Sequence, residues 1–405
     1  MRQARVVVGG CLGVALLAGG VGGLLDPEIA RTAFSGDGEL APFTISWLER
    51  YRVAALGVAA AALGATALAL VRRRALAQRL ARHPLCLPRA AALCVSLVVG
   101  LGLAEIGLRL SGALDAVQST NTAAYADYTR AFWQRVRGQL NAQGYRDEPW
   151  PPRDAGDDYR ILVIGDSFVF GFGVAEREDC FPAALAAALA RRPGLVRCRV
   201  FNAGRPGADT VEQVRMLTEL QPLLQPDLVV LGYYVNDAES EAEKQAFFGQ
   251  RRLLPLVSDN LERVSHVWRL LEGRVLATLE SLGGRRTYVD QLRAQTAPGS
   301  EAWEEHRGQL ERFFEQAGEP AALVLFPLIS DLENYPLEAM HRAVEGVASE
   351  AGVPSLDLRT VLVGTSVEDL KVTAFDPHLD ARALERTAEA TAAFLEDQGL
   401  VPHDP

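Results

Sequence analysis

The stretch YRILVIGDSFVFGFGV, residues 159–174, changes character half-way along. Its first part, YRILVIG, is dominated by an apolar run typical of a buried strand, and this run stops at Gly165, Asp166 and Ser167. A polar residue directly after such a strand lies at its carboxyl end, which is where open parallel sheets bind their ligands. Ser167 is therefore a candidate for chemistry, with an ordinary turn serine as the alternative.

Strand and helix patterns alternate through the rest of the chain. Further strand patterns are VRCRVFNAG, PDLVVLGYYV, AALVLFPLI and PSLDL, and helical patterns are FPAALAAALARR, TVEQVRMLTELQPLLQ, LEAMHRAVEGVASEAG and ARALERTAEATAAFLEDQG. Such alternation predicts an α/β domain over 159–405, with a parallel sheet covered by helices on both faces. Residues from about 238 to 318 are charged and helical in period, and predict a helical insertion that caps one side of the site.

Three apolar segments precede this domain. They cover about 6–25, 53–71 and 90–110 of the 405 residues, and each approaches the roughly 20 residues that cross a bilayer as a helix. We predict a membrane anchor of three transmembrane helices in 1–112, followed by a polar connector in 113–158. Buried helices of a soluble core are the alternative, but such helices seldom lack charge over this length.

Charge predicts how the anchor is oriented. The stretch RRRALAQRLARHPLCLPR between the second and third segments has six arginines and no acid, whereas the loop at 26–52 has more acids than bases. Short loops rich in Lys and Arg stay in the cytoplasm. The pattern places the N-terminus in the cytoplasm and everything after the third segment outside. A cleaved signal peptide at 6–25 is the alternative, but two further apolar segments favour a retained anchor.

Near the end of the third segment, Glu105 lies four residues before Arg109. This spacing places both side chains on one helix face, and we expect them to pair there.

Composition excludes several classes of function. The formal net charge of −10 includes the basic cytoplasmic loop, so the outer domain is more acidic still and offers no nucleic-acid surface. Two cysteines, Cys180 and Cys198, lie in the outer domain at opposite ends of a predicted helix, too far apart to bridge, and we expect free thiols. No zinc-type spacing, Walker lysine or dinucleotide-binding glycine pattern occurs, so no metal and no organic cofactor is expected.

A serine hydroxyl becomes a useful nucleophile when a histidine, itself held by a carboxylate, removes its proton. His378 lies in AFDPHLD, just before the last predicted helix, and Asp376 lies two residues upstream. The other histidines lie in the predicted cytoplasmic loop, in charged helical stretches or in the C-terminal tail: His83, His266, His306, His341 and His403. The pattern therefore favours Ser167 as nucleophile, His378 as base and Asp376 as the orienting acid.

Acyl transfer also needs donors for the negative charge that develops on the carbonyl oxygen. Three candidates follow the first three strands: the backbone N–H of Ser167, the backbone N–H of Gly204 and the side-chain amide of Asn236. Asp166 and Asp237, beside two of them, are expected to bond loop backbone. The GFGV stretch is expected to form a flexible loop at the edge of the site.

The order of these blocks resembles the SGNH (GDSL-type) hydrolases. GDSF corresponds to the block of the nucleophile Ser167, NAG to that of Gly204, YYVND to that of Asn236, and DPH to that of Asp376 and His378. The resemblance implies a flavodoxin-like three-layer α/β/α domain and a serine esterase that works through an acyl-enzyme. The segments LNAQGYRDEPW, SEAW and LVLFP resemble a membrane-anchored bacterial subgroup, which implies a multi-pass protein of the bacterial inner membrane with a periplasmic catalytic domain.

The final block departs from the commonest family pattern. The position three residues before His378, where that pattern has its acid, is Phe375. A spacing of two resembles the branch of the superfamily that O-acetylates polysaccharides. Three functions therefore remain: an esterase acting on an acylated small molecule, glycan or lipid; an O-acyltransferase for an envelope or secreted polysaccharide; and a non-catalytic envelope binding protein.

Overall fold

The protein is described here by a computed structural model that covers residues 2–24, 42–82, 86–111, 123–153, 158–239, 243–244, 247, 253, 261, 265–283, 287–373 and 376–404. The chain forms two compact units. The first comprises Met1–Leu114 and Ala246–Leu276, and the second comprises Asp115–Gln245 and Ala277–Pro405.

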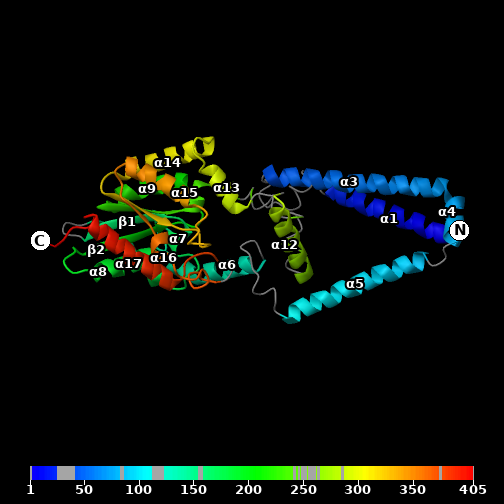
Figure 1. The fold of residues 1–405 in the computed structure, drawn as a ribbon, viewed down its shortest axis with the longest axis horizontal. Coiled ribbons are helices and arrows are strands. Elements are labelled where there is room, and N and C mark those ends of the chain that lie inside the picture. Colours follow the sequence, from blue (N-terminus) through cyan, green and yellow to red (C-terminus); the bar gives the residue numbers. More distant parts are fainter. Residues whose placement is uncertain are drawn as a thin grey trace. The chain divides into compact units, whose positions relative to one another are not determined.

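The second unit contains a parallel sheet of five strands in the order β2-β1-β3-β4-β5 (Figure 1). The strands are β1 Tyr159–Gly165, β2 Cys198–Gly204, β3 Leu228–Tyr234, β4 Ala321–Phe326 and β5 Ser355–Asp357. Each lies inside one of the five predicted strand patterns, which confirms the predicted α/β domain with a parallel sheet.

The strands β1, β2 and β3 end level with one another. Gly165 of β1 pairs with Gly204 of β2 on one side and with Gly232 of β3 on the other. The chain moves from β1 outward to β2 and then returns past β1 to β3, so the strand order reverses at β1. Such a switch point leaves a crevice at the carboxyl ends, and the segment that follows β1 begins in it.

Helices cover both faces of this sheet (Figure 1). The helix α8 (Phe181–Ala190) packs against α17 (Ala381–Asp397), while α14 (Glu301–Ala317) packs against both α9 (Thr210–Leu224) and α15 (Glu338–Glu350). Two helical layers on a central sheet form a three-layer α/β/α arrangement. Shorter helices are η1 Arg137–Gln139, α7 Ser167–Phe170, η2 Arg177–Asp179, η3 Val235–Ala238, α13 Tyr288–Gln295 and α16 Arg359–Leu362.

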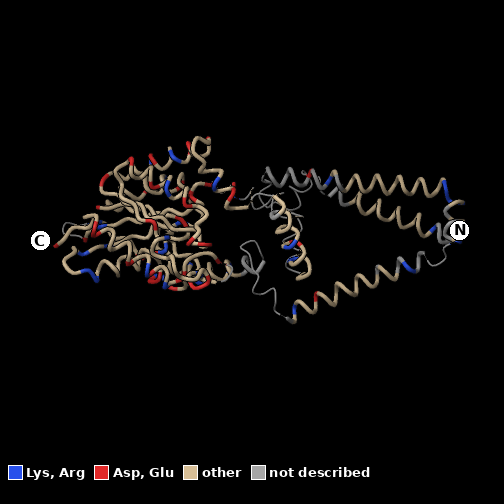
Figure 2. The backbone as a smooth tube through the Cα atoms, in the orientation of Figure 1, with Lys and Arg blue, Asp and Glu red and all other residues tan. Residues whose placement is uncertain are grey.

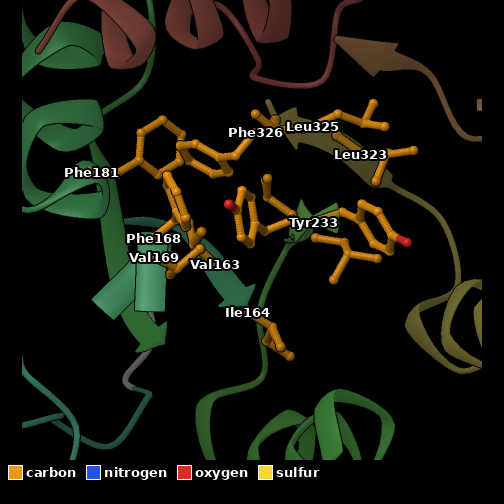
Figure 3. Packing of buried hydrophobic residues seen from close by; sticks show 14 of the residues in the cluster. Val163, Ile164, Phe168, Val169, Phe181, Tyr233, Leu323, Leu325 and Phe326 are labelled. Carbon is orange, nitrogen blue, oxygen red and sulfur yellow. The ribbon is translucent and has the colours of Figure 1, made fainter. Parts of the chain in front are cut away.

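The hydrophobic core extends directly beneath the end of β1 (Figure 3). The ring of Phe326, from β4, lies 5.4 Å from that of Phe168 and 5.1 Å from that of Phe181, measured between centroids. All three side chains are buried, and burying a phenylalanine contributes about 2 kcal/mol. Phe168, the second residue of α7, therefore fixes the turn after β1 to the hydrophobic core.

The described residues between β3 and β4 form helices, as the charge and periodicity predict: α12 His266–Ser281, α13 and α14. In α14, Trp303, Leu310 and Phe314 share one face at spacings of seven and four and are buried. Because α14 packs on α9 and leads into β4, this part of the stretch covers the sheet.

In the first unit, three long helices coincide with the predicted apolar segments: α1 Arg2–Leu24, α3 Pro42–Val71 and α5 Cys86–Ser111, with α4 Arg73–Arg82 after the second. Their described parts carry few charges (Figure 2). A search of the described residues nevertheless finds no helix that is both long and apolar enough to span a membrane. The predicted helices are present, and their crossing of a bilayer stays a prediction.

Within α5, the Arg109 Nε donates to the Glu105 Oε1 at 2.8 Å, as the spacing predicts. Much of the predicted first outer loop, residues 25–41, lies outside the described residues.

The described residues of the predicted connector, 123–153 and 158, include regular secondary structure. The connector contains α6, Ala123–Val136, which belongs to the second unit. Phe132 and Val136 of this helix are buried against Phe170 and Phe172, which follow Ser167. The described part of the connector is therefore packed onto the α/β unit beside the end of β1.

Candidate active site

Ser167 is the first residue of α7, immediately after β1. The preceding Asp166 caps this short helix, because its Oδ1 accepts the N–H of Phe168 at 2.9 Å. This is the backbone role expected for Asp166. The turn holds Ser167 at the carboxyl edge of the sheet with 8% of its surface exposed.

The structure brings Ser167, His378 and Asp376 together, although the first two are 211 positions apart. The Ser167 Oγ lies 2.8 Å from the His378 Nε2, and the His378 Nδ1 lies 2.5 Å from the Asp376 Oδ1. Both distances are within hydrogen-bond reach. This is the arrangement in which an imidazole takes the serine proton while a carboxylate holds the ring.

The environment of Asp376 keeps it ionised. Burial alone would raise the pKa of this carboxyl group, but the hydrogen bonds from His378 and from the hydroxyl of Tyr128 together hold the pKa below its ordinary value. A carboxylate at this position accepts the Nδ1–H of His378. That tautomer leaves the Nε2 lone pair free to accept the proton of Ser167.

Two aromatic rings hold the imidazole of His378. The centroid of Phe168 lies 5.0 Å from it and that of Phe172 lies 4.9 Å from it. Phe172 is buried and belongs to the GFGV stretch. That stretch lies at the site, as expected, but it is packed against the base, which is not the arrangement of a flexible edge loop.

Arg146 fixes the same loop from the connector side. Its guanidinium is fully buried and donates to the carbonyl oxygens of Gly171 at 2.6 Å and of Val174 and Ala175 at 3.0 Å. The sequence reasoning missed this residue. The signal in the sequence is the arginine of LNAQGYRDEPW. This segment resembles the membrane-anchored bacterial subgroup, but the resemblance assigns no role to any one of its residues.

Two of the three predicted oxyanion donors are available. Within the part of the chain that the structure describes, the backbone N–H of Ser167 and the side-chain amide of Asn236 form no hydrogen bond. Asn236 follows β3 in η3, and β3 neighbours β1, the strand that precedes Ser167. Both groups therefore remain candidates for donors to a substrate oxygen.

The backbone N–H of Gly204 already donates to another acceptor within the protein, so this geometry does not support its predicted role as an oxyanion donor. Its backbone N–H donates to the Oδ1 of Asn202 at 2.9 Å. A β-carbon at Gly204 would lie 2.1 Å from the backbone nitrogen of Phe170, so the glycine is needed for the close approach of α7 to the sheet.

A second glycine in the same loop was missed. Gly207 takes φ +83°, a conformation that favours glycine, and within the described residues its N–H forms no hydrogen bond. The signal that was passed over is the second glycine of NAGRPGAD. Gly207 is therefore the better candidate for a donor from the loop after β2.

We predict that Gly204→Ala lowers stability by about 2 kcal/mol, because the new methyl group meets backbone that has nowhere to move. Alanine keeps the backbone N–H, so a loss of activity would follow from displacement of α7. Denaturant unfolding followed by circular dichroism measures the first effect. Unchanged stability would contradict this packing role of Gly204.

A second buried acid lies beside the site. The Asp237 Oδ2 accepts from the Gln213 Nε2 at 2.8 Å and from the N–H of Tyr234 at 3.1 Å, the backbone role expected for it. Burial and the neighbouring charge of Asp166 raise the pKa of Asp237 well above its ordinary value, and the buried ammonium of Lys244 opposes this rise. These groups shape the field around Ser167 without touching the imidazole.

His306 and His341 are buried and bonded to other side chains, as packing residues are. The His306 Nε2 lies 3.0 Å from the hydroxyl of Tyr233, and burial lowers the pKa of His306 to about 4. His341 is buried between the hydroxyl of Tyr335 and the carboxylate of Asp357, both at 3.0 Å.

Cys180 and Cys198 are free thiols, as predicted. Burial raises the pKa of Cys180 to about 12 and that of Cys198 to about 11.

A parallel α/β sheet with a serine, a histidine and a carboxylate in one hydrogen-bonded chain at its carboxyl edge is an arrangement typical of acyl hydrolases. Comparison with family models agrees: the model described as the GDSL-like lipase/acylhydrolase family matches residues 163–385. The chain belongs to this family and is an ester-hydrolysing enzyme that acts on acylated substrates.

Several solved structures match this chain with low similarity. They include a lipase/acylhydrolase from Enterococcus faecalis (17% identity, TM-score 0.38, covering 61% of this chain and 98% of that one). TesA (19%, TM-score 0.36, 59% and 98%) and an extracellular lipase from Streptomyces rimosus (16%, TM-score 0.35, 58% and 98%) are further examples. A comparison with curated proteins finds no similar sequence.

Proposed function

We propose that the protein is a serine esterase that cleaves an O-acyl ester through a triad of Ser167, His378 and Asp376. The observation that carries this proposal is the 2.8 Å contact between the Ser167 Oγ and the His378 Nε2, in a histidine whose other nitrogen is held by a buried carboxylate. Such a contact aligns the hydroxyl proton with the base before substrate arrives.

In the proposed reaction, the Ser167 Oγ forms a bond to the ester carbonyl carbon while its proton passes to the His378 Nε2. The ester C–O bond then breaks, and His378 returns the proton to the departing alcohol. Water, deprotonated by the same nitrogen, then forms a bond to the acyl carbon. The bond from this carbon to the Ser167 Oγ breaks, and His378 returns the proton to the Oγ, which releases the acid and free Ser167. The N–H of Ser167, the amide of Asn236 and the N–H of Gly207 stabilise the charged oxygen in both steps.

We further propose that the three apolar helices anchor the enzyme in the bacterial inner membrane, with the N-terminus in the cytoplasm and the catalytic unit in the periplasm. The support is the arginine-rich stretch around α4 and the scarcity of charge in α1, α3 and α5. An enzyme held there meets acylated glycans and lipids of the envelope, which are the substrates we propose.

Transfer to a sugar hydroxyl is the second candidate. The spacing of two residues between Asp376 and His378 favours it, because the polysaccharide O-acetylation branch has this spacing. The two functions share every step up to the acyl-enzyme and differ in whether water or a sugar hydroxyl removes the acyl group.

Labelling with a fluorophosphonate tests the proposal. We expect one equivalent of probe per chain, with the modified peptide carrying Ser167, because the reagent reacts with serines activated by a base. The exposed Ser349, at the end of α15, is a matched control: Ser349→Ala should label like the wild type. Absence of labelling, or labelling at any other serine, would refute the triad.

An acetylated polysaccharide incubated with the enzyme then separates the two outcomes. Release of free acetate identifies the hydrolase, and movement of acetyl groups onto an unacetylated acceptor glycan identifies the transferase. Reporter fusions on either side of the apolar segments test the proposed topology: a reporter after residue 405 should be active in the periplasm.

A further inference from the structure

The helix α6 reaches the proposed catalytic acid from outside the matched family region. The hydroxyl of Tyr128 donates to the Asp376 Oδ2 at 2.5 Å, across 248 positions of sequence. The other oxygen, Oδ1, accepts the Nδ1–H of His378 at 2.5 Å and the backbone N–H of His378 at 3.1 Å. The two oxygens of the carboxylate are thus bound by different elements.

Because Asp376 is buried, the hydrogen bond from Tyr128 to its Oδ2 replaces a bond that water would otherwise make. The side chain of Asp376 is 0% exposed, so an oxygen without a donor would lose its hydration and gain nothing in return. Within the residues that the structure describes, the donor to Oδ2 is Tyr128. A distance of 2.5 Å is typical of a hydroxyl bound to an ionised carboxylate, which is among the stronger hydrogen bonds in proteins.

The position of Tyr128 is itself fixed. One turn further along α6, the ring of Phe132 packs tilted against that of Phe172 with 4.4 Å between centroids, and Tyr128 meets the same ring edge-on at 6.5 Å. Phe172 in turn lies 4.9 Å from the ring of His378. One helix therefore touches the acid through a hydroxyl and supports the base through an aromatic ring.

We propose that Tyr128 is a positioning residue that holds Asp376 in the orientation its histidine requires, and that α6 is a structural part of the catalytic centre. The inference rests on the proposed triad and deepens it. A carboxylate bound at one oxygen alone can rotate about its Cβ–Cγ bond. The second bond removes this freedom, so Oδ1 keeps facing Nδ1 and the imidazole keeps facing Ser167.

Tyr128→Phe removes the hydroxyl and keeps the ring. We expect kcat for a soluble aryl ester to fall about tenfold with KM changed less than twofold, because the hydroxyl acts on the acid and not on the substrate. Tyr159→Phe is the matched control. Its hydroxyl also bonds within the protein, to the carbonyl of Leu400 at 2.8 Å, but it lies at the start of β1, on the opposite edge of the sheet.

The pH profile separates positioning from a general loss of structure. Without the hydroxyl of Tyr128, the charge of the Asp376 carboxylate is stabilised by one hydrogen bond fewer, and the carboxylate attracts the imidazolium more strongly. The acidic limb of kcat/KM is therefore expected to move to higher pH by about 0.5 unit. The carboxylate of Asp166 also acts on His378 and is unchanged in this variant. An acidic limb that stays in place would overturn the proposal, as would an unchanged kcat.

A double-mutant cycle completes the test. In an Asp376→Asn background, Tyr128→Phe is expected to cost less than about twofold, because its action runs through the acid. A full tenfold loss in both backgrounds would overturn the proposal.

A readout that needs no turnover keeps this inference distinct from the proposed function. The downfield proton resonance of the His378 Nδ1–H in the full-length protein is expected to move when Tyr128 becomes Phe and to stay unchanged in Tyr159→Phe. A moving resonance in an enzyme that hydrolyses no ester would sustain the positioning role and refute the esterase. An unmoved resonance in an enzyme that hydrolyses esters would sustain the esterase and refute the positioning role.

Discussion

Ser167→Ala is expected to lower kcat for an activated ester by about 10⁵-fold, and His378→Ala is expected to do the same. The reason is the 2.8 Å contact between the Ser167 Oγ and the His378 Nε2. A serine without its base is a poor nucleophile, and a base without its serine has nothing to deprotonate except water. Initial rates with p-nitrophenyl acetate, with the protein concentration determined from absorbance at 280 nm, measure both losses.

The double variant Ser167→Ala/His378→Ala is expected to be no slower than either single variant, because two groups that act as one unit are lost together. Ser349→Ala should retain wild-type kcat. Losses that multiply in the double variant would show that the two residues act independently, and the proposed proton transfer between them would then be wrong.

Much of the α/β unit follows from local patterns. The first strand was predicted at 159–165 and occurs there, because a run of buried apolar residues ends at a glycine that pairs with glycines on both neighbouring strands. The predicted helix patterns at α8, α9, α15 and α17 each contain one observed helix. Local patterns suffice for such elements because strands buried on both faces form continuous apolar runs, and helices with one buried face repeat every 3.6 residues.

The choice among backbone donors could not be made from sequence. Gly204 and Gly207 are both plausible in NAGRPGAD, and each offers an N–H at the end of β2. What separates them is the side chain of Asn202, which turns back to accept the N–H of Gly204. A hydrogen bond between residues two apart depends on the side-chain rotamer, which no residue pattern specifies.

The predicted connector contains a helical pattern of apolar residues that its polar composition obscures. Tyr128, Phe132 and Val136 recur every four residues, which is a helical stripe, yet the surrounding composition is polar. The stripe predicts a helix with one buried face. It does not predict that the hydroxyl of Tyr128 reaches Asp376, because a contact across 248 positions arises from tertiary packing alone.

Two buried aspartates lie close to Ser167, and replacing each by asparagine is expected to have very different effects. Asp376→Asn should lower kcat by about 10³- to 10⁴-fold, because a neutral amide cannot stabilise the imidazolium that forms when His378 takes the serine proton. Asp166→Asn should cost less than about tenfold. Asparagine still accepts the N–H of Phe168 and caps α7, and the Asp166 Oδ2 contacts the Ser167 Oγ at 3.2 Å without touching the imidazole.

The pH dependence of these two variants adds a second criterion. The pKa of Asp376 lies below its ordinary value, so this group is ionised throughout the range in which an esterase is assayed, and its charge is available to His378 at every such pH. Burial raises the pKa of Asp166, so its charge is lost first as the pH falls. If Asp166→Asn proved the more damaging change at pH 8, the orienting acid would be Asp166, and the spacing of two residues before His378 would have no catalytic meaning.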